Sequence, residues 1–502
     1  MKTPKVPYLQ YEILEYFHLQ PDKSLSEYVG YPEDGRIVRS GIEKLIEKSL
    51  LETNLKLTNT GSFLVNKNIP SRFNHPDYSK VTLNNGFTHQ SSLFTTTKSN
   101  NQNGKVFRWY KYLEDFPHDF INESIKKYKL DFNYFLLDPF VGSGTTQVQA
   151  KIDGIKSIGM DINPVMVFNS KCKLNWNIDN ILLTNYLENL IGEFKNTPID
   201  KQKTLSSKSD IFNMPKRELN QWLSPIKQWE VGYMFYLIEK VTLEGNIRKL
   251  IRFIASTSAL NSSYVAFCPG TTFYPFRSKP DFLYEFAKLS NWVLEDLKDD
   301  RIQSKKTIYS EVFGYSAKEL VFVNKFKNKV DLILTSPPYP NDLEYTRQTR
   351  LEMYTLGYVR NMEEVQKLKK KMVKGSTKLI YTDDYMREET ESMKSILIIR
   401  SALTEKLKDK NWGFDYPKMI QQYFSDMWTC MENFHKVLVK NGTCILVVGD
   451  QTFKGIVIPV AEILAEIAER IGFKSYKIEL HRNRRSTMHS IPIPEENLIL
   501  TK

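Results

Sequence analysis

The chain has 502 residues, of which 41% are hydrophobic and 13% aromatic, so it is long enough to form about three domains with apolar cores. It contains no run of ~18 uncharged apolar residues and no N-terminal signal pattern, so we expect a cytoplasmic protein that does not contact a membrane. Four widely spaced cysteines predict neither a metal site nor a disulfide framework, and the net charge of +12 favours a polyanionic partner such as nucleic acid.

The first 70 residues have the pattern of a winged-helix-like module. Apolar residues recur at helical spacing over Tyr8–Leu19, Ser24–Tyr31 and Gly41–Leu51, and a strand–turn–strand pattern follows at residues 55–65. The basic residues near the third helix either contact DNA or form a solvated face of a packing module. Residues 71–104 are rich in Asn, Ser, Thr and Lys and are predicted to be a linker.

From residue 133 onward, strands alternate with helices, which is typical of a mostly parallel sheet covered on both faces. The expected strands are Tyr134–Leu137, Lys156–Met160, Thr307–Val312, Val330–Leu334 and Thr443–Val448, followed by a closing antiparallel pair at Ser475–Leu480 and Asn497–Leu500. Two long interruptions, at about 173–303 and 343–435, are expected to be mainly helical. The predicted fold class is therefore α/β, with a doubly wound Rossmann-like sheet, a closing hairpin and helical insertions.

The first chemical motif follows the first strand of this sheet and precedes a helical stretch. Its residues are Asp138, Pro139, Phe140, Val141, Gly142, Ser143, Gly144, Thr145 and Thr146. Glycines at such a turn let the backbone approach a ligand, and the helix start offers free N–H groups. Asp161 ends the next strand about twenty residues later, where a carboxylate can accept hydrogen bonds from both ribose hydroxyls. Because no P-loop Lys-Ser/Thr pair follows, the spacing predicts a nucleoside-type cofactor.

The second motif is formed by Ser336, Pro337, Pro338 and Tyr339, directly after the strand at Val330–Leu334. Two consecutive prolines lock the backbone and hold the nearby carbonyls as acceptors. We expect the Ser336 hydroxyl and the Pro337 carbonyl to accept hydrogen bonds from an exocyclic amine while Tyr339 stacks on the base. The amine nitrogen would then be aimed at a methyl donor.

On these two motifs the chain resembles the amino-methyltransferases of DNA. In that family the Ser-Pro-Pro-Tyr form is associated mainly with N4 methylation of cytosine, whereas an Asp in place of the serine leans toward N6 of adenine. The resemblance implies S-adenosyl-L-methionine as cofactor, with Phe116 and Pro117 at its methionine end, and double-stranded DNA as substrate. The target base would be flipped out of the duplex and methylated directly.

The resemblance also implies a division of the chain. Residues 105–172 would form the cofactor-binding half of the methyltransferase domain and 304–502 the catalytic half, including the basic insertion 343–435. The helical insertion 173–303 is a candidate for target recognition. Candidate phosphate contacts are Lys367–Lys371 and His481–Arg485.

One departure and several alternatives remain at this point. Relatives often place an acid after the third strand to hold the adenine of the cofactor, whereas this chain has Gly314, Tyr315, Ser316 and Ala317 there. Alternative functions are adenine-N6 methylation of DNA, guanine-N2 methylation of tRNA and a regulator with a degenerate methyltransferase half. Gene neighbours would test the expected pairing with a restriction endonuclease.

Overall fold

The computed structural model describes residues 44–46, 83, 104–112, 114–115, 117–241, 245–267, 272–273, 280–410, 413, 415–485 and 492–502. The predicted winged-helix-like module and linker lie outside the described residues, apart from residues 44–46, which are helical, and residues 83 and 104. The chain divides into two compact units. The sheet unit comprises Ser91–Ile178, Glu295–Arg347 and Met362–Lys502, and the helical unit comprises Met1–Gln90, Asp179–Leu294 and Gln348–Asn361.

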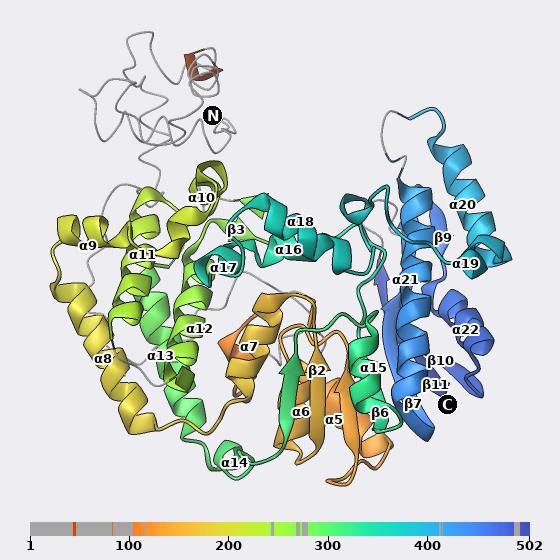
Figure 1. Cartoon of the computed structure of the whole chain (residues 1–502), viewed down its shortest axis with the longest axis horizontal. Coiled ribbons are helices and arrows are strands. Elements are labelled where there is room, and N and C mark those ends of the chain that lie inside the picture. The colour runs from red at the N-terminus through yellow and green to blue at the C-terminus, as the bar shows by residue number, and fades with distance from the viewer. Residues whose placement is uncertain are drawn as a thin grey trace. The chain divides into compact units, whose positions relative to one another are not determined.

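A seven-stranded sheet forms the centre of the sheet unit (Figure 1), with the strand order β10-β11-β7-β6-β1-β2-β5. Its strands are β1 (Phe135–Asp138), β2 (Lys156–Met160), β5 (Ser310–Phe313), β6 (Val330–Thr335), β7 (Leu438–Gly449), β10 (Ser475–Arg485) and β11 (Pro492–Thr501). Strands β5, β2, β1, β6 and β7 are parallel, whereas β11 pairs antiparallel with both β7 and β10. The predicted doubly wound sheet with a closing hairpin is thus confirmed, with a longer hairpin than the sequence pattern indicated.

Helices cover both faces of this sheet, because successive strand residues point to opposite sides. Leu137 and Ile333 belong to the core that also contains residues of α21 and α22, whereas Leu136 and Leu332 pack with residues of α5. The helices of this unit are η2 (Phe107–Trp109), α5 (His118–Lys127), α6 (Thr145–Ile152), α7 (Pro164–Leu174), α14 (Asp300–Gln303), α15 (Leu320–Phe326), α18 (Met362–Lys371), η4 (Thr377–Leu379), α19 (Glu388–Ser392), α20 (Lys394–Leu407), α21 (Tyr416–Val437) and α22 (Val460–Ile471). A small hairpin, β8 (Gln451–Phe453) and β9 (Ile456–Ile458), follows β7.

The helical unit is built mainly from the predicted insertion after α7. It contains α8 (Asn180–Asn196), α9 (Ile199–Ser206), η3 (Asp210–Asn213), α10 (Lys216–Trp222), α11 (Pro225–Lys240), α12 (Gly245–Ser262), a short hairpin of β3 (Val265–Ala266) and β4 (Thr272–Phe273), and α17 (Arg350–Thr355). Helix α11 packs against α8, α9 and α12 (Figure 1). Two helices, α13 (Phe282–Leu297) and α16 (Tyr345–Gln348), have residues in both units. None of the described helices is long and apolar enough to cross a bilayer.

Candidate active site

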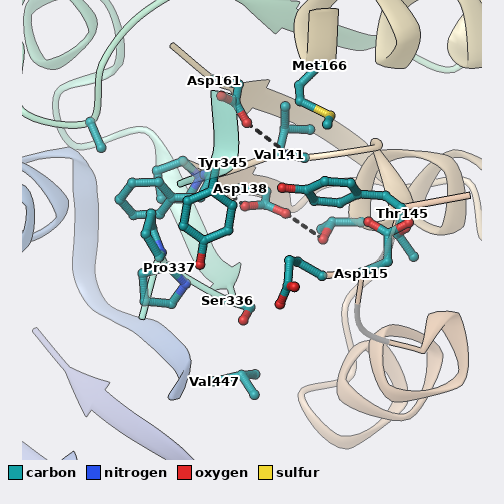
Figure 2. A pocket seen from close by; sticks show the side chains of 18 of the residues that line it. Asp115, Asp138, Val141, Thr145, Asp161, Met166, Ser336, Pro337, Tyr345 and Val447 are labelled. Carbon is teal, nitrogen blue, oxygen red and sulfur yellow. Dashed lines mark hydrogen bonds between the residues drawn. The ribbon is translucent and has the colours of Figure 1, made fainter. Parts of the chain in front are cut away.

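A cavity of about 450 Å³ lies in the sheet unit where β1, β2 and β6 end (Figure 2). Both predicted motifs contribute to its wall. The predicted site residues that line it are Pro117, Asp138, Phe140, Gly142, Thr145, Thr146, Asp161, Ser336, Pro337, Pro338 and Tyr339. Ser143 is buried and, like Gly144, is not part of the cavity wall, and Phe116 lies outside the described residues. The carboxyl ends of parallel strands meet at one edge of a sheet, which is why motifs about 190 residues apart share one cavity.

The turn between β1 and α6 depends on its two glycines. Gly142 and Gly144 have φ values of 50° and 85°, in the left-handed region that favours glycine. A Cβ atom on Gly144 would also lie 2.8 Å from the Ser170 Oγ of α7. The turn can therefore lie close against α7 and open its other side to the cavity.

Asp161 fixes this turn from the end of β2. Its Oδ2 accepts a hydrogen bond from the Gly142 N–H at 3.1 Å, and its Oδ1 accepts one from the Asn163 N–H at 2.8 Å. Burial raises the pKa of the Asp161 carboxyl to about 7, although these backbone donors oppose the shift. Each carboxylate oxygen has a second lone pair, so Asp161 can also accept from hydroxyl groups in the cavity.

Asp138 links the two motifs at the wall of the cavity. Its carboxylate accepts hydrogen bonds from Thr146 Oγ1 at 2.7 Å and from Thr335 Oγ1 at 2.6 Å, and Thr335 directly precedes Ser336. Burial raises the pKa of Asp138 to about 6, against the effect of these hydroxyl donors. Through these two hydrogen bonds, the buried Asp138 connects the start of α6 to the end of β6.

A buried lysine, which the sequence motifs did not identify, supports the same turn. Lys173 on α7 is 1% exposed, and its ammonium group donates to the Ser143 carbonyl oxygen at 2.8 Å. Burial lowers the pKa of Lys173 to about 8. The Ser143 hydroxyl in turn donates to Asp115, which lines the cavity. The inner side of the turn is therefore held by charged and polar groups.

The second motif forms a compact turn after β6. The Ser336 hydroxyl donates to the Tyr339 hydroxyl at 3.1 Å, and the Tyr339 N–H donates to the Tyr345 hydroxyl at 3.3 Å. Tyr339 is only 8% exposed, and its hydroxyl oxygen lies 3.1 Å from both the Val447 carbonyl oxygen and Glu495 Oε1. The predicted stacking of Tyr339 on a base stays a prediction, but its hydroxyl belongs to an internal hydrogen-bond chain.

The backbone of this turn rests on a glycine from a distant segment. A Cβ atom on Gly375 would clash with the carbonyl oxygen of Tyr339, so only a glycine fits there. The Gly375 carbonyl accepts from the Asp342 N–H at 2.9 Å, which ties both sides of the contact together. No motif near Gly375 in the sequence indicated this role.

An aromatic pair lies at the end of β5, close to the position where an acid was absent from the sequence. The rings of Phe313 and Tyr315 are stacked, with centroids 5.5 Å apart, and Tyr315, Ser316 and Ala317 line the cavity. A flat apolar surface of this kind can contact a purine ring. This aromatic pair would offer a purine ring an apolar contact surface, where relatives have an acid that accepts a hydrogen bond.

The two candidate phosphate-binding stretches carry several internal ion pairs. On α18, Lys369 pairs with Glu344 at 3.1 Å, and Lys370 pairs with Asp383 at 2.8 Å. On β10, Arg482 contacts Glu495, and both residues line the cavity. Part of the positive charge that the sequence suggested for DNA is therefore compensated within the chain.

Comparisons with known proteins find DNA methyltransferases. A family model described as DNA methylase, of the N6/N4 type, matches residues 26–170. The chain is 25% identical over 443 residues to the Type II methyltransferase M.AvaI of Nostoc sp., covering 82% of this chain and 86% of the relative. It is also 25% identical over 431 residues to the Type II methyltransferase M.BsoBI of Geobacillus stearothermophilus, covering 77% and 82% of the two chains. With both motifs at one cavity of the expected sheet, the chain is similar to the amino-methyltransferases of DNA.

Proposed function

We propose that this protein transfers a methyl group from S-adenosyl-L-methionine to N4 of cytosine in double-stranded DNA. The observation that carries the proposal is the meeting of Ser336 with the turn at Gly142 and with Asp161 around one cavity. The cavity volume of about 450 Å³ falls in the range typical of small-molecule sites, roughly 300–1,000 Å³. The Type II methyltransferase relatives support a role beside a restriction endonuclease.

The residues around the turn fit a nucleoside cofactor that ends in an amino acid. Asp161 would accept from its ribose hydroxyls, the ring of Tyr315 would contact its base, and Pro117 and Asp115 would lie at its methionine end. When bound, S-adenosyl-L-methionine supplies a methyl group on a sulfonium, which is a good leaving group. The remaining chemistry falls to side chains that orient the amine.

Ser336 and the Pro337 carbonyl would hold that amine. An exocyclic amine is a poor nucleophile, because its lone pair is delocalised into the ring. Hydrogen bonds from its N–H groups to these two acceptors would turn the nitrogen toward the methyl group, and fixed orientation of this kind lowers the barrier substantially. The buried Asp138 would keep this end of β6 in register with the cofactor turn, because it holds Thr335.

The choice of cytosine rests on Ser336, since serine before the two prolines is the form associated with N4 methylation in this family. Adenine-N6 methylation is the alternative, because the same acceptors suit either amine and the matching family model spans both types. For base recognition we propose the helical insertion 173–303. A winged-helix-like module at 1–70 would add DNA contacts.

Nucleoside analysis of methylated DNA tests the proposal. The protein would be incubated with S-adenosyl-L-methionine labelled in its methyl group and with duplex DNA or tRNA, and the digested products would be separated by mass spectrometry. We expect label in N4-methylcytosine from duplex DNA. Label in N6-methyladenine would replace the cytosine assignment with the alternative, and label only in tRNA would contradict the DNA substrate.

A further inference from the structure

Glu495 is a buried carboxylate beside the Ser336 turn, and neither sequence motif includes it. It is 5% exposed and lies on β11, directly opposite Arg482 of β10. Its Oε2 contacts the Arg482 Nε, and its Oε1 lies 3.1 Å from the Tyr339 hydroxyl oxygen. The hairpin thus brings an acceptor to the side of the turn that faces away from β1.

These contacts fix the direction of a hydrogen-bond chain. A guanidinium only donates and a carboxylate only accepts, so Glu495, paired with Arg482, can only accept from Tyr339. A second acceptor for the Tyr339 hydroxyl is the Val447 carbonyl at 3.1 Å, which also only accepts. Whichever of the two takes the phenol proton, the Tyr339 oxygen presents a lone pair to the Ser336 hydroxyl.

The direction of this chain determines what Ser336 offers to the cavity. The Ser336 hydroxyl has one proton, which it donates to Tyr339 at 3.1 Å, and two lone pairs. With its proton engaged, the serine can only accept hydrogen bonds from the cavity. An amine that must keep its own lone pair for the methyl group needs an acceptor there.

We propose that Glu495, acting through Tyr339, is a positioning residue that fixes the Ser336 hydroxyl as the acceptor for the target amine. The inference rests on the proposed amine methylation, and it adds a role for the closing hairpin in that reaction. If the Glu495 end of the chain donated instead, Tyr339 could turn its proton to Ser336. Ser336 would then donate toward the amine nitrogen and oppose the required orientation.

Glu495→Gln is the most selective variant for this test, because it keeps the size of the side chain. The new amide oxygen is needed by Arg482, which leaves the amide NH₂ group facing Tyr339 and reverses the polarity of the contact. We expect the single-turnover rate of methyl transfer to fall about tenfold, because the Val447 carbonyl still accepts and one hydrogen bond contributes about that factor. The affinity for S-adenosyl-L-methionine should stay within about twofold.

The matched control is Glu496→Gln at the next position of β11. Successive residues of a strand point to opposite faces, so this variant changes the same chemical group away from the turn. We expect it to transfer methyl groups at the wild-type rate. Thermal unfolding and cofactor titration of each variant show that the fold is retained.

A double-mutant cycle separates positioning from a general structural role. Tyr339→Phe keeps the ring but removes the link, so Glu495→Gln should have no further effect on the transfer rate in that background. If Glu495→Gln does not fold, the same cycle is run with Glu495→Asp, whose shorter side chain withdraws the carboxylate from Tyr339, and we again expect no further loss in the Tyr339→Phe background.

Three results would overturn the inference. They are multiplicative losses in the cycle, a wild-type rate for Glu495→Gln, and a loss confined to cofactor affinity. Failure of the wild-type protein to methylate any DNA would remove the proposed function and this inference together. Normal wild-type transfer with multiplicative losses would remove the inference alone.

Discussion

The two sides of the cavity are held in different ways. The cofactor side, from Asp138 to Asp161, is stabilised mainly by backbone N–H groups and side chains from neighbouring segments, apart from the hydrogen bond between Thr335 and Asp138. The amine side, around Ser336, depends on contacts of Tyr339 with Gly375, Val447 and Glu495, of which the last two come from more than 100 residues later in the chain. A change on one side should therefore leave the function of the other side measurable.

The largest effect is expected for Ser336→Ala. Loss of the hydroxyl removes one of the two proposed acceptors for the amine, and removing one group of this kind from an active site costs about 100-fold or more in rate. Affinity for S-adenosyl-L-methionine should be unchanged, because Ser336 is on the other side of the cavity. Single-turnover kinetics and calorimetric titration measure the two quantities. Full transfer by the variant would refute the role of Ser336.

Gly375→Ala should damage the amine side through the backbone. The new Cβ would clash with the Tyr339 carbonyl oxygen, so the turn must shift, and overpacking of this kind costs about 1–3 kcal/mol of stability. We expect transfer to fall at least about tenfold, since small displacements of reacting groups are costly. Cofactor binding should persist. Gly192→Ala is the control, because a Cβ atom at Gly192 has nothing within 4 Å.

Gly144→Ala is the corresponding change on the cofactor side. The residue has a φ of 85°, and its Cβ would lie 2.8 Å from Ser170 Oγ. We expect a loss of about 1–3 kcal/mol in stability and about tenfold weaker binding of S-adenosyl-L-methionine. Denaturant unfolding and calorimetry measure both. Unchanged cofactor affinity in the folded variant would argue against a role of the turn in cofactor binding.

The raised pKa of Asp161 predicts that cofactor binding depends on pH. Its pKa is raised to about 7 by burial, so the carboxyl is largely protonated below that pH and accepts ribose hydroxyls less well. We expect affinity for S-adenosyl-L-methionine to weaken as the pH falls from 8 to 6, by roughly tenfold per pH unit at most. Asp161→Asn should bind more weakly and lose this dependence. Equal pH profiles for the two proteins would contradict the assignment.

The smallest effect concerns stability at Glu496, where three acidic groups meet. Burial, Glu462 and Asp450 raise the pKa of Glu496 to about 7. Between the ordinary glutamate pKa and about pH 7, Glu496 keeps its proton in the folded state but loses it in the unfolded chain. The free energy of unfolding therefore falls as the pH rises through that window. Glu496→Gln removes the penalty. We expect a gain of about 1 kcal/mol at pH 8, limited by partial exposure of the group, and little change at pH 4.

Thermal unfolding at several pH values measures this gain. Glu479→Gln should behave in the opposite way, because Lys477 and Lys127 lower the pKa of Glu479. Its loss of stability would appear at neutral pH and vanish in acid. A gain for Glu496→Gln that is equal at pH 4 and pH 8 would contradict the electrostatic explanation.

The contrast between the two sides also shows what could be predicted from the sequence. The strands β2 and β6 and the cofactor turn follow from local patterns, because a buried strand, two glycines and an acid leave their signal within a short window. The supporting positions Lys173, Gly375 and Glu495 carry no such signal. Their roles depend on contacts across 30, 36 and 156 residues, which only the assembled sheet defines.

The hairpin illustrates the same limit. The sequence pattern ended the first strand at Leu480, before the basic run that was a candidate for phosphate contacts, whereas β10 continues to Arg485. The strand is longer because of cross-strand pairing: Arg482 lies opposite Glu495 of β11 and contacts its carboxylate. A charge that looks exposed in sequence can be satisfied inside a sheet when its partner is opposite.

The central claim is that one cavity joins the cofactor turn to the Ser336 turn. Its most direct test compares the wild-type protein with Ser336→Ala. Both would be incubated with duplex DNA and S-adenosyl-L-methionine carrying a deuterated methyl group. We predict deuterated N4-methylcytosine with the wild-type protein and about 100-fold less with the variant, at equal cofactor affinity. Equal amounts of product from both proteins, or no methylated base with the wild-type protein, would contradict the account.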